Sequence, residues 1–311
     1  MTLFITESEV TNILSHKKAI ELLDEGMKAV GSGKAFNMPR KRIPVGYGGG
    51  AMNIMAASWP EKGIAGHKSY VVSKGKATFV VLLYSTEGNG LLAVIEANML
   101  GQIRTGAASG LASKYMANNK SKTLSIIGTG FQAQSQLLSI ASIFDLDAVN
   151  VYSRSENKRN LFVSNLSKQV DVEIKPHENL ENAIEGSDII CLITNSAKPV
   201  LPDEFITNGM HINAAGGNNW LRSEISPESM EKFHLITCDS IEQAKYESKE
   251  LMEATEKGII SWNNVKELGS LIYENKKRES KNHITLYESL GIAIQDLSVA
   301  KYIYDQISSV K

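Results

Sequence analysis

A glycine-rich turn between a short apolar run and a helical pattern is the feature that most limits the fold of this chain. The run Leu124–Ile127 is followed by the segment GTGFQA, residues 128–133, and then by apolar residues at helical spacing. In such a strand-turn-helix unit the first glycine makes the tight turn, the second lets the backbone approach a pyrophosphate, and the alanine permits close helix–strand contact. The helix N-terminus adds N–H groups that suit a phosphate. The segment predicts a dinucleotide site around Gly128 and Gly130.

Short apolar runs alternate with helical or polar segments through this part of the chain. They lie at residues 124–127, 149–151, 172–174, 189–193, 210–213 and 235–237. Such an alternation is typical of a parallel sheet with crossover helices. We therefore predict an α/β protein whose larger domain is a Rossmann-type, doubly wound parallel sheet of six strands.

The residues before this region have a different pattern. Thr6 and Glu9 have the spacing of a capping box, and apolar residues recur at helical intervals from Ile13 to Val30. Two apolar runs, 77–84 and 91–95, flank a Gly-Asn-Gly turn and predict a hairpin. The last 25 or so residues, from about Leu290, read as one amphipathic helix.

These patterns predict two domains. Residues 118–285 form the dinucleotide-binding Rossmann domain, and residues 1–117 together with 286–311 form a smaller α+β domain. The final helix returns to pack on that smaller domain.

Composition excludes several classes of function. The 33 basic and 34 acidic side chains nearly cancel, which argues against nucleic acid or a membrane surface as a partner. No apolar run approaches the roughly 20 residues of a membrane span, and the first residues lack the pattern of a signal peptide, so we expect a cytoplasmic protein. Cys191 and Cys238 lack metal-site spacing, so we expect buried thiols and no metal.

The end of the second predicted strand bears on which dinucleotide binds. An NAD site commonly places an acidic residue there for the ribose hydroxyls, whereas this chain has Ser153, Arg154 and Ser155. Two hydroxyls around an arginine suit a 2′-phosphate better, which favours NADP(H) over NAD(H). A solvated Arg154 at a strand end is the alternative. Thr194 and Asn195 follow the fourth strand, where either ligand contact or ordinary turn chemistry explains them.

Three cations precede the dinucleotide region, namely Arg40, Lys68 and Arg104. Taken singly, each is more typical of a solvated surface charge. Arg104 stands out because it precedes Thr105, which we predict to be the N-cap of a helix rich in small residues. An arginine fork suits a substrate carboxylate, and a lysine near other cations can have its pKa lowered enough to exchange a proton.

Several segments, in order along nearly the whole chain, resemble the ornithine cyclodeaminase/mu-crystallin family. They are Lys68 in AGHKSYVV, IRTGAASGLASKYMA, IIGTGFQAQSQ, HINAAGGNNWLRSEI and ESLGIAIQDLSVAK. The resemblance implies an NAD(P)-dependent oxidoreductase that reduces an α-imino acid or ketimine, with a small amino, imino or keto acid as substrate. It also implies a homodimer whose first domain, completed by the C-terminal helix, carries the substrate and dimer contacts.

The resemblance also assigns residues. Arg40, Lys68 and Arg104 match positions for the substrate carboxylate and catalysis, with Arg42 as a rival for Arg40, and Leu290 matches a substrate contact. Taken together, the residue patterns and the resemblance predict these cofactor contacts: Thr78, Arg104, Gly128, Gly130, Phe131, Gln132, Ser153, Arg154, Ser155, Thr194, Asn195, Ala214, Ala215 and Ser289. His211 begins a matching segment, and we interpret it as a buried polar side chain.

One departure from the family pattern limits the reaction. Where the cyclodeaminases and the alanine dehydrogenase of the family carry a catalytic Asp after HINA, this chain has Asn218. An amide cannot exchange a proton near neutral pH, so Asn218 is predicted to orient the nitrogen or a water. Ornithine cyclodeaminase activity, which forms proline and ammonia with bound NAD, is therefore the alternative, and a non-catalytic, crystallin-like NADP(H)-binding protein is a distant third.

Overall fold

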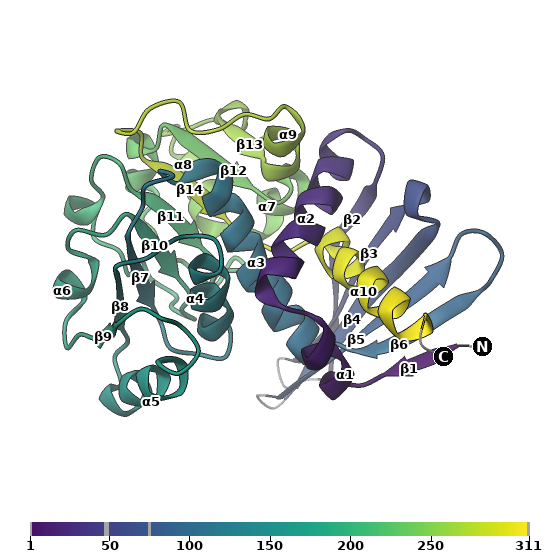
Figure 1. Cartoon of the computed structure of the whole chain (residues 1–311). Helices are drawn as coiled ribbons and strands as arrows, with labels where there is room; N and C mark the ends of the chain where they lie inside the picture. Colours follow the sequence, from purple (N-terminus) through teal and green to yellow (C-terminus); the bar gives the residue numbers. More distant parts are fainter. Residues whose placement is uncertain (1, 47–49, 74–75, 310–311) are drawn as a thin grey trace. The chain divides into compact units, whose positions relative to one another are not determined.

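The computed structural model describes residues 2–46, 50–73 and 76–309, and the chain forms two compact units (Figure 1). Unit 1 consists of Met1–Arg104 and Gly291–Lys311, and unit 2 of Thr105–Leu290. The predicted domain boundaries were after residues 117 and 285, whereas the two units divide after Arg104 and after Leu290. Helix α3 (Asn98–Met116) crosses the first boundary without a break, so Thr105 lies inside a helix and the prediction of an N-cap there is wrong.

Unit 1 is built on a six-stranded sheet, counted over the described residues. In spatial order its strands are β1 (Leu3–Ile5), β6 (Leu91–Glu96), β5 (Lys76–Ser85), β4 (Ile64–Ser73), β3 (Gly50–Trp59) and β2 (Phe36–Val45). Strand β1 runs parallel to β6, and the other neighbours are antiparallel. The predicted hairpin is confirmed as β5 and β6.

Helices pack on this sheet within unit 1. The capping box at Thr6 is confirmed, but the predicted single helix is two, α1 (Glu7–Ile13) and α2 (His16–Gly31). The break has a local cause, because the Ser15 side chain accepts a hydrogen bond from the Lys18 amide and starts a new helix. Helix α10 (Ala293–Ser308) packs between α2 and strands β3, β4 and β5 (Figure 1). It begins three residues after Leu290, later than predicted.

Unit 2 is built on a parallel sheet of eight strands among the described residues, not the six predicted. In spatial order they are β13 (Val265–Glu267), β12 (Leu235–Cys238), β14 (Thr285–Glu288), β11 (His211–Ala214), β10 (Ile189–Leu192), β7 (Thr123–Ile127), β8 (Ala148–Tyr152) and β9 (Ile174–Pro176). The two missed strands are β13 and β14, and β14 lies between β11 and β12.

The connecting helices of unit 2 are α4 (Ala133–Ala141), α5 (Glu156–Leu166), α6 (Leu180–Ile184), α7 (Ile241–Glu247), α8 (Lys249–Glu256) and α9 (Leu268–Tyr273). Short 3-10 turns lie at Pro60–Lys62 in unit 1 and at Asp203–Phe205, Glu228–Lys232 and Trp262–Asn264 in unit 2. No helix among residues 2–46, 50–73 and 76–309 combines the length and apolarity needed to cross a membrane.

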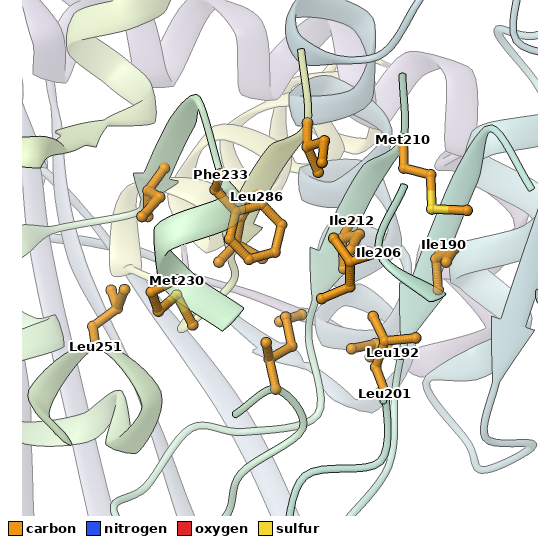
Figure 2. Packing of buried hydrophobic residues seen from close by; sticks show 14 of the residues in the cluster. Ile190, Leu192, Leu201, Ile206, Met210, Ile212, Met230, Phe233, Leu251 and Leu286 are labelled. Carbon is orange, nitrogen blue, oxygen red and sulfur yellow. The ribbon is translucent and has the colours of Figure 1, made fainter. Parts of the chain in front are cut away.

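The core of unit 2 explains why its strands appear as short apolar runs. Strands β10, β11 and β14 are buried along their whole length, as expected of a parallel sheet covered on both faces. Leu192, Ile212 and Leu286 come from these three adjacent strands and share one apolar cluster (Figure 2). Because all eight strands are parallel, their carboxyl ends lie along one edge of the sheet, where such folds bind ligands.

Candidate functional site

A lysine is buried on the helix-covered face of the unit 1 sheet. Strand β4 alternates between buried and partly buried residues, and Lys68 falls on the buried side with Ile64 and Gly66. Across the sheet Lys68 pairs with Met55 on β3 and Val81 on β5, which are also buried. Only 3% of Lys68 is exposed, so its ammonium group is held inside the unit rather than in bulk water.

An aspartate that the sequence reasoning did not identify holds two of the predicted cations. Asp296 lies in the first turn of α10. Its Oδ1 accepts hydrogen bonds from Lys68 Nζ at 3.0 Å and from Arg104 Nε at 3.0 Å. The neighbouring Gln295 side chain accepts a second bond from Arg104, at 2.9 Å from Nη1 to Oε1. A Gln-Asp pair in the first turn of a helix that is buried over Ala293–Ala300 was the sequence signal for this role.

The structure brings Arg40, rather than Arg42, into this group. The pairing of β2 with β3 shifts register between Met38 and Lys41, and such a bulge redirects side chains. Arg40 is buried and donates from Nη2 to the Gly291 carbonyl at 3.2 Å. Arg42 is exposed and donates instead to Asn53 Oδ1 at 3.0 Å.

Two glycines leave room for these cations. A side chain at Gly101 would place its Cβ 2.9 Å from Lys68 Nζ. At Gly291, where φ is +76°, a Cβ would lie 2.7 Å from Arg104 Nη1. Both positions therefore need glycine for close approach, and Gly291 also needs it for its backbone conformation.

The charges around Lys68 suit an anion. Burial lowers the pKa of Lys68 to about 8; Asp296 opposes this shift, whereas Arg104 and Arg40 add to it. Three cations and one carboxylate thus meet in a desolvated region, and they leave an excess of positive charge. We call Arg40, Lys68, Arg104 and Asp296 the cation cluster. Such a group can bind a small carboxylate and hold or release a proton at Lys68 Nζ near neutral pH.

In unit 2 the glycine-rich turn has the geometry expected of a dinucleotide site. Gly128 follows β7 with φ at +113°, and a Cβ there would lie 2.4 Å from the Ile193 carbonyl oxygen. A Cβ at Gly130 would meet nothing within 4 Å, so the backbone is open to a ligand. Ala133 is fully buried at the start of α4, and Gln132 Oε1 is buried without a hydrogen-bond partner among the described residues. These residues fit a pyrophosphate at the helix N-terminus.

Residues at the end of β8 line the same sheet edge. Ser153 accepts a hydrogen bond from Thr129 Oγ1 at 2.9 Å, which joins the turns after β7 and β8. Ser155 is the N-cap of α5, and Arg154 is exposed. The side chain of Arg159 is buried beneath this turn and donates from Nη1 to the Ser153 carbonyl. Phe131 is 53% exposed.

The ends of β10 and β11 are joined by Glu224, which the sequence reasoning also missed. Its Oε1 accepts from the Thr194 amide at 2.6 Å and from Thr194 Oγ1 at 2.7 Å, and its Oε2 accepts from the Gly216 amide at 2.7 Å. Asn195 beside Thr194 is exposed. Burial raises the pKa of Glu224 to about 7, while the bonds from Thr194 and Gly216 oppose that shift.

Of the remaining residues predicted for the site, all but Thr78 belong to unit 2. Ala214 ends β11 and accepts at its carbonyl from the Ser289 amide, and the Ala215 amide donates to Leu192. Leu290 is buried and donates its amide to Asp239 Oδ2 at 2.8 Å. Asn218 is partly buried in the loop after β11. Thr78, in unit 1, is exposed on β5.

His211 is a structural residue of unit 2. It is fully buried and hydrogen-bonded to Thr285 Oγ1 at 2.9 Å and Asn213 Oδ1 at 3.2 Å. Burial, with Arg278 nearby, lowers the pKa of His211 to about 3, so the ring is neutral at physiological pH. Cys191 and Cys238 are free and buried, as predicted.

Comparisons with known proteins agree with this geometry. A sequence model of the ornithine cyclodeaminase/mu-crystallin family matches residues 1–311. The chain is 34% identical to the alanine dehydrogenase of Archaeoglobus fulgidus, over 99% of this chain and 96% of that protein. It is 30% identical to a Delta(1)-pyrroline-2-carboxylate reductase of Bacillus cereus, over 98% and 96% of the two chains.

Solved structures of the same two kinds of enzyme are also similar to this chain. The Delta(1)-pyrroline-2-carboxylate reductase of Thermococcus litoralis, in complex with NADH and L-proline, superposes with a TM-score of 0.94 at 29% identity, covering 99% of this chain and 98% of that one. An archaeal alanine dehydrogenase dimer with bound NAD has a TM-score of 0.91 at 32% identity, covering 99% and 97%.

Proposed function

Because the chain belongs to the ornithine cyclodeaminase/mu-crystallin family and is an NAD(P)-dependent oxidoreductase of that family, we propose that it reduces a small α-imino acid to the corresponding amino acid. The cation cluster carries this proposal. A single carboxylate, Asp296, is hydrogen-bonded to Lys68 and Arg104, and Arg40 adds a further positive charge, so the cluster suits an anionic substrate. An α-imino acid carries the carboxylate that these groups recognise.

Each group of the cluster has a distinct task in this proposal. Arg104 and Arg40 bind the substrate carboxylate, and the Asp296 side chain holds Arg104 in place through Nε. Lys68 carries a proton on Nζ and passes it to the substrate nitrogen as the C=N bond becomes a C–N bond. The reduced nicotinamide, when bound at the unit 2 sheet edge, supplies the hydride to the imine carbon. Asn218 orients the nitrogen or a water and takes no proton.

The relatives indicate the size of the substrate. They include an alanine dehydrogenase, a Delta(1)-pyrroline-2-carboxylate reductase and a reductase of the same kind solved with NADH and L-proline. We therefore propose a substrate of three to five carbons, either a five-membered cyclic imine or the imine formed from pyruvate and ammonia. Ornithine cyclodeaminase activity is the second candidate, and Asn218 disfavours it because an amide cannot serve as the general base.

An absorbance assay tests the proposal. The purified chain is incubated with NADPH or NADH and, separately, with pyrroline-2-carboxylate, its six-membered homologue, or pyruvate plus ammonia. We expect loss of absorbance at the reduced nicotinamide band with at least one of these substrates. Formation of proline from ornithine without net cofactor oxidation would instead establish the second candidate, and dinucleotide binding without either reaction would leave a non-catalytic binding protein.

For the cofactor, we propose that NADP(H) binds more tightly than NAD(H). The turn after β8 offers Ser153, Arg154 and Ser155 and no acidic residue for the ribose hydroxyls, and Arg154 is exposed to a ligand. A 2′-phosphate would meet a guanidinium there. Calorimetric titration of both reduced dinucleotides tests this preference. Arg154→Ala should weaken NADPH binding by about tenfold and leave NADH binding within twofold; tighter binding of NADH by the wild type would contradict it.

For assembly, we propose a homodimer in which unit 1 supplies contacts. Strand β2 is the last strand in the order of the unit 1 sheet, and Ile43, Met52 and Val71 form a row across β2, β3 and β4. Ile43 is 53% exposed, which suits an apolar contact. The archaeal alanine dehydrogenase to which this chain is similar is a dimer. Sedimentation velocity should give twice the chain mass, and Ile43→Lys should shift the protein toward the monomer; a monomeric wild type would contradict the proposal.

A further inference from the structure

We infer that Glu224 is the positioning residue for the nicotinamide half of the cofactor site. The inference rests on the proposed function in one respect, that a pyridine dinucleotide binds at the edge of the unit 2 sheet. Glu224 lies outside every position predicted from the sequence, yet it is 1% exposed and links the two loops that leave β10 and β11.

The topology of the sheet indicates which half of the dinucleotide lies near Glu224. The pyrophosphate belongs at the turn after β7, and the adenosine ribose belongs at the end of the next strand along the chain, β8. Strands β8 and β9 lie on one side of β7, whereas β10 and β11 lie on the other. A dinucleotide that crosses β7 therefore extends its nicotinamide half over the ends of β10 and β11.

The carboxylate of Glu224 uses both oxygens to hold these two ends together. Oε1 accepts two bonds from Thr194 after β10, and Oε2 accepts one from Gly216 after β11. A Cβ at Gly216 would lie 2.1 Å from the Thr194 carbonyl oxygen and 2.6 Å from Glu224 Oε1. Glycine is thus needed for the two loops to approach each other around the carboxylate. We call Thr194, Gly216 and Glu224 the loop clasp.

Two further buried acidic groups lie near Glu224, and one of them, Glu250, bonds to its backbone. Glu250, at the start of α8, accepts from the Glu224 amide at 2.6 Å, and Ser248 donates to Glu288 Oε1 at 3.1 Å. Glu250 and Glu288 are each 1% exposed. Burial raises the pKa of both, and Glu250 adds to the shift of Glu288, so protonated forms limit the repulsion among the three groups. Glu224 keeps three donors and is the member that reaches the sheet edge.

The variant Glu224→Gln tests this role with little change in volume. An amide has one acceptor oxygen and one NH₂ donor, so either the Thr194 or the Gly216 amide would face another donor. Calorimetry on the full chain measures the Kd of the reduced dinucleotide that the wild type binds more tightly. It also measures the Kd of ADP-ribose, or of its 2′-phosphate, which has no nicotinamide.

We expect Glu224→Gln to raise the Kd of the dinucleotide by about tenfold and to change the Kd of the ADP-ribose probe by less than twofold. A general loss of structure would weaken both ligands alike, and that result, or no change in either Kd, would overturn the inference. The matched control is Glu228→Gln, because Glu228 is exposed and forms a surface ion pair with Lys257 at 2.6 Å. It should leave both Kd values unchanged.

A milder variant covers the case in which Glu224→Gln fails to fold. Thr194→Val keeps the amide bond to Glu224 and removes the hydroxyl bond to Glu224, together with the longer bond that this hydroxyl accepts from the Ser196 amide at 3.3 Å. It should raise the dinucleotide Kd by roughly threefold and spare the ADP-ribose probe; equal effects on the two ligands would overturn the inference. A wild-type chain that binds no dinucleotide would contradict the proposed function itself, whereas normal wild-type binding with no selective effect contradicts only the role of Glu224.

Discussion

The two units bury charge in opposite ways. In unit 1 the cation cluster surrounds one carboxylate with lysine and arginine side chains, and positive charge is in excess. In unit 2 Glu224 is stabilised chiefly by backbone amides and one hydroxyl. Flexible side chains that carry excess charge suit a ligand that must bind and leave, whereas backbone donors suit a fixed support. Burial of charge alone therefore does not identify a catalytic group; its hydrogen-bond partners do.

Removing the lysine charge should have the largest effect in this comparison. Lys68→Met keeps an unbranched apolar side chain against Met55 and Val81 and leaves Asp296 bonded to Arg104. If Lys68 supplies the proton, kcat for imine reduction should fall by a factor of about 10² to 10⁴. Steady-state kinetics at saturating dinucleotide measure this change.

The control for Lys68→Met is Lys62→Met in the same unit. Lys62 forms an exposed ion pair with Glu25 at 3.0 Å, and such pairs contribute little to stability. Its kcat should match that of the wild type. An unchanged kcat in Lys68→Met would remove Lys68 from proton transfer.

Substitution of the two arginines of β2 should have different effects on KM rather than on kcat. Arg40→Met removes a buried guanidinium near Lys68, and we expect KM for the imino acid to rise roughly 10- to 100-fold. Arg42→Met removes an exposed side chain bonded to Asn53, and its KM should stay within about twofold. Kinetics of both variants decide which arginine binds the carboxylate; equal effects would contradict the assignment.

The bulge that separates these arginines also shows where sequence reasoning ended. The glycine-rich turn and the strand runs were predictable because their signals are local. Five of the six runs match β7, β8, β10, β11 and β12, whereas the run 172–174 shares only Ile174 with β9. A single-residue register shift in β2 leaves no such signal, so Arg40 and Arg42 stayed alternatives. Strand β14, with the short sequence TLYE, was missed because its place depends on pairing with β11 and β12.

Two acidic residues were missed because their partners lie far from them along the chain. Asp296 is 228 residues from Lys68 along the chain, and Glu224 is 30 residues from Thr194. Neither spacing belongs to a recurring motif, so only the fold reveals that these side chains meet. The segments that resemble the family contain both acidic residues, but the resemblance assigned roles to the cations and not to these two acids.

The pH dependence should reveal how Asp296 acts on Lys68. Burial lowers the pKa of Lys68 to about 8, so the protonated form is lost as the pH rises through that value. The kcat/KM for imine reduction should therefore fall about tenfold per pH unit above pH 8. Asp296→Asn removes the charge that raises the Lys68 pKa, so this alkaline limb should move to lower pH by at least about one unit.

The control for the pH profile lies on the same helix. Asp305 pairs with Lys301 at 2.6 Å near the end of α10 and is 46% exposed. Asp305→Asn should leave the alkaline limb in place. A profile of Asp296→Asn that matches the wild type would show that Asp296 does not tune Lys68.

The smallest effect is expected where space, not charge, is changed. Gly291 and Gly33 have nearly equal backbone angles, φ +76° and φ +74°, so alanine at either should cost about 1 to 2 kcal/mol of folding free energy. Only at Gly291 would the new Cβ meet the Arg104 guanidinium, because nothing lies within 4 Å at Gly33. We expect Gly291→Ala to raise KM for the imino acid by roughly tenfold, since small displacements of a binding group are costly. Gly33→Ala should lower the melting temperature about as much as Gly291→Ala does, but it should leave KM unchanged. Equal KM values for the two variants would show that the position of Arg104 does not control substrate binding.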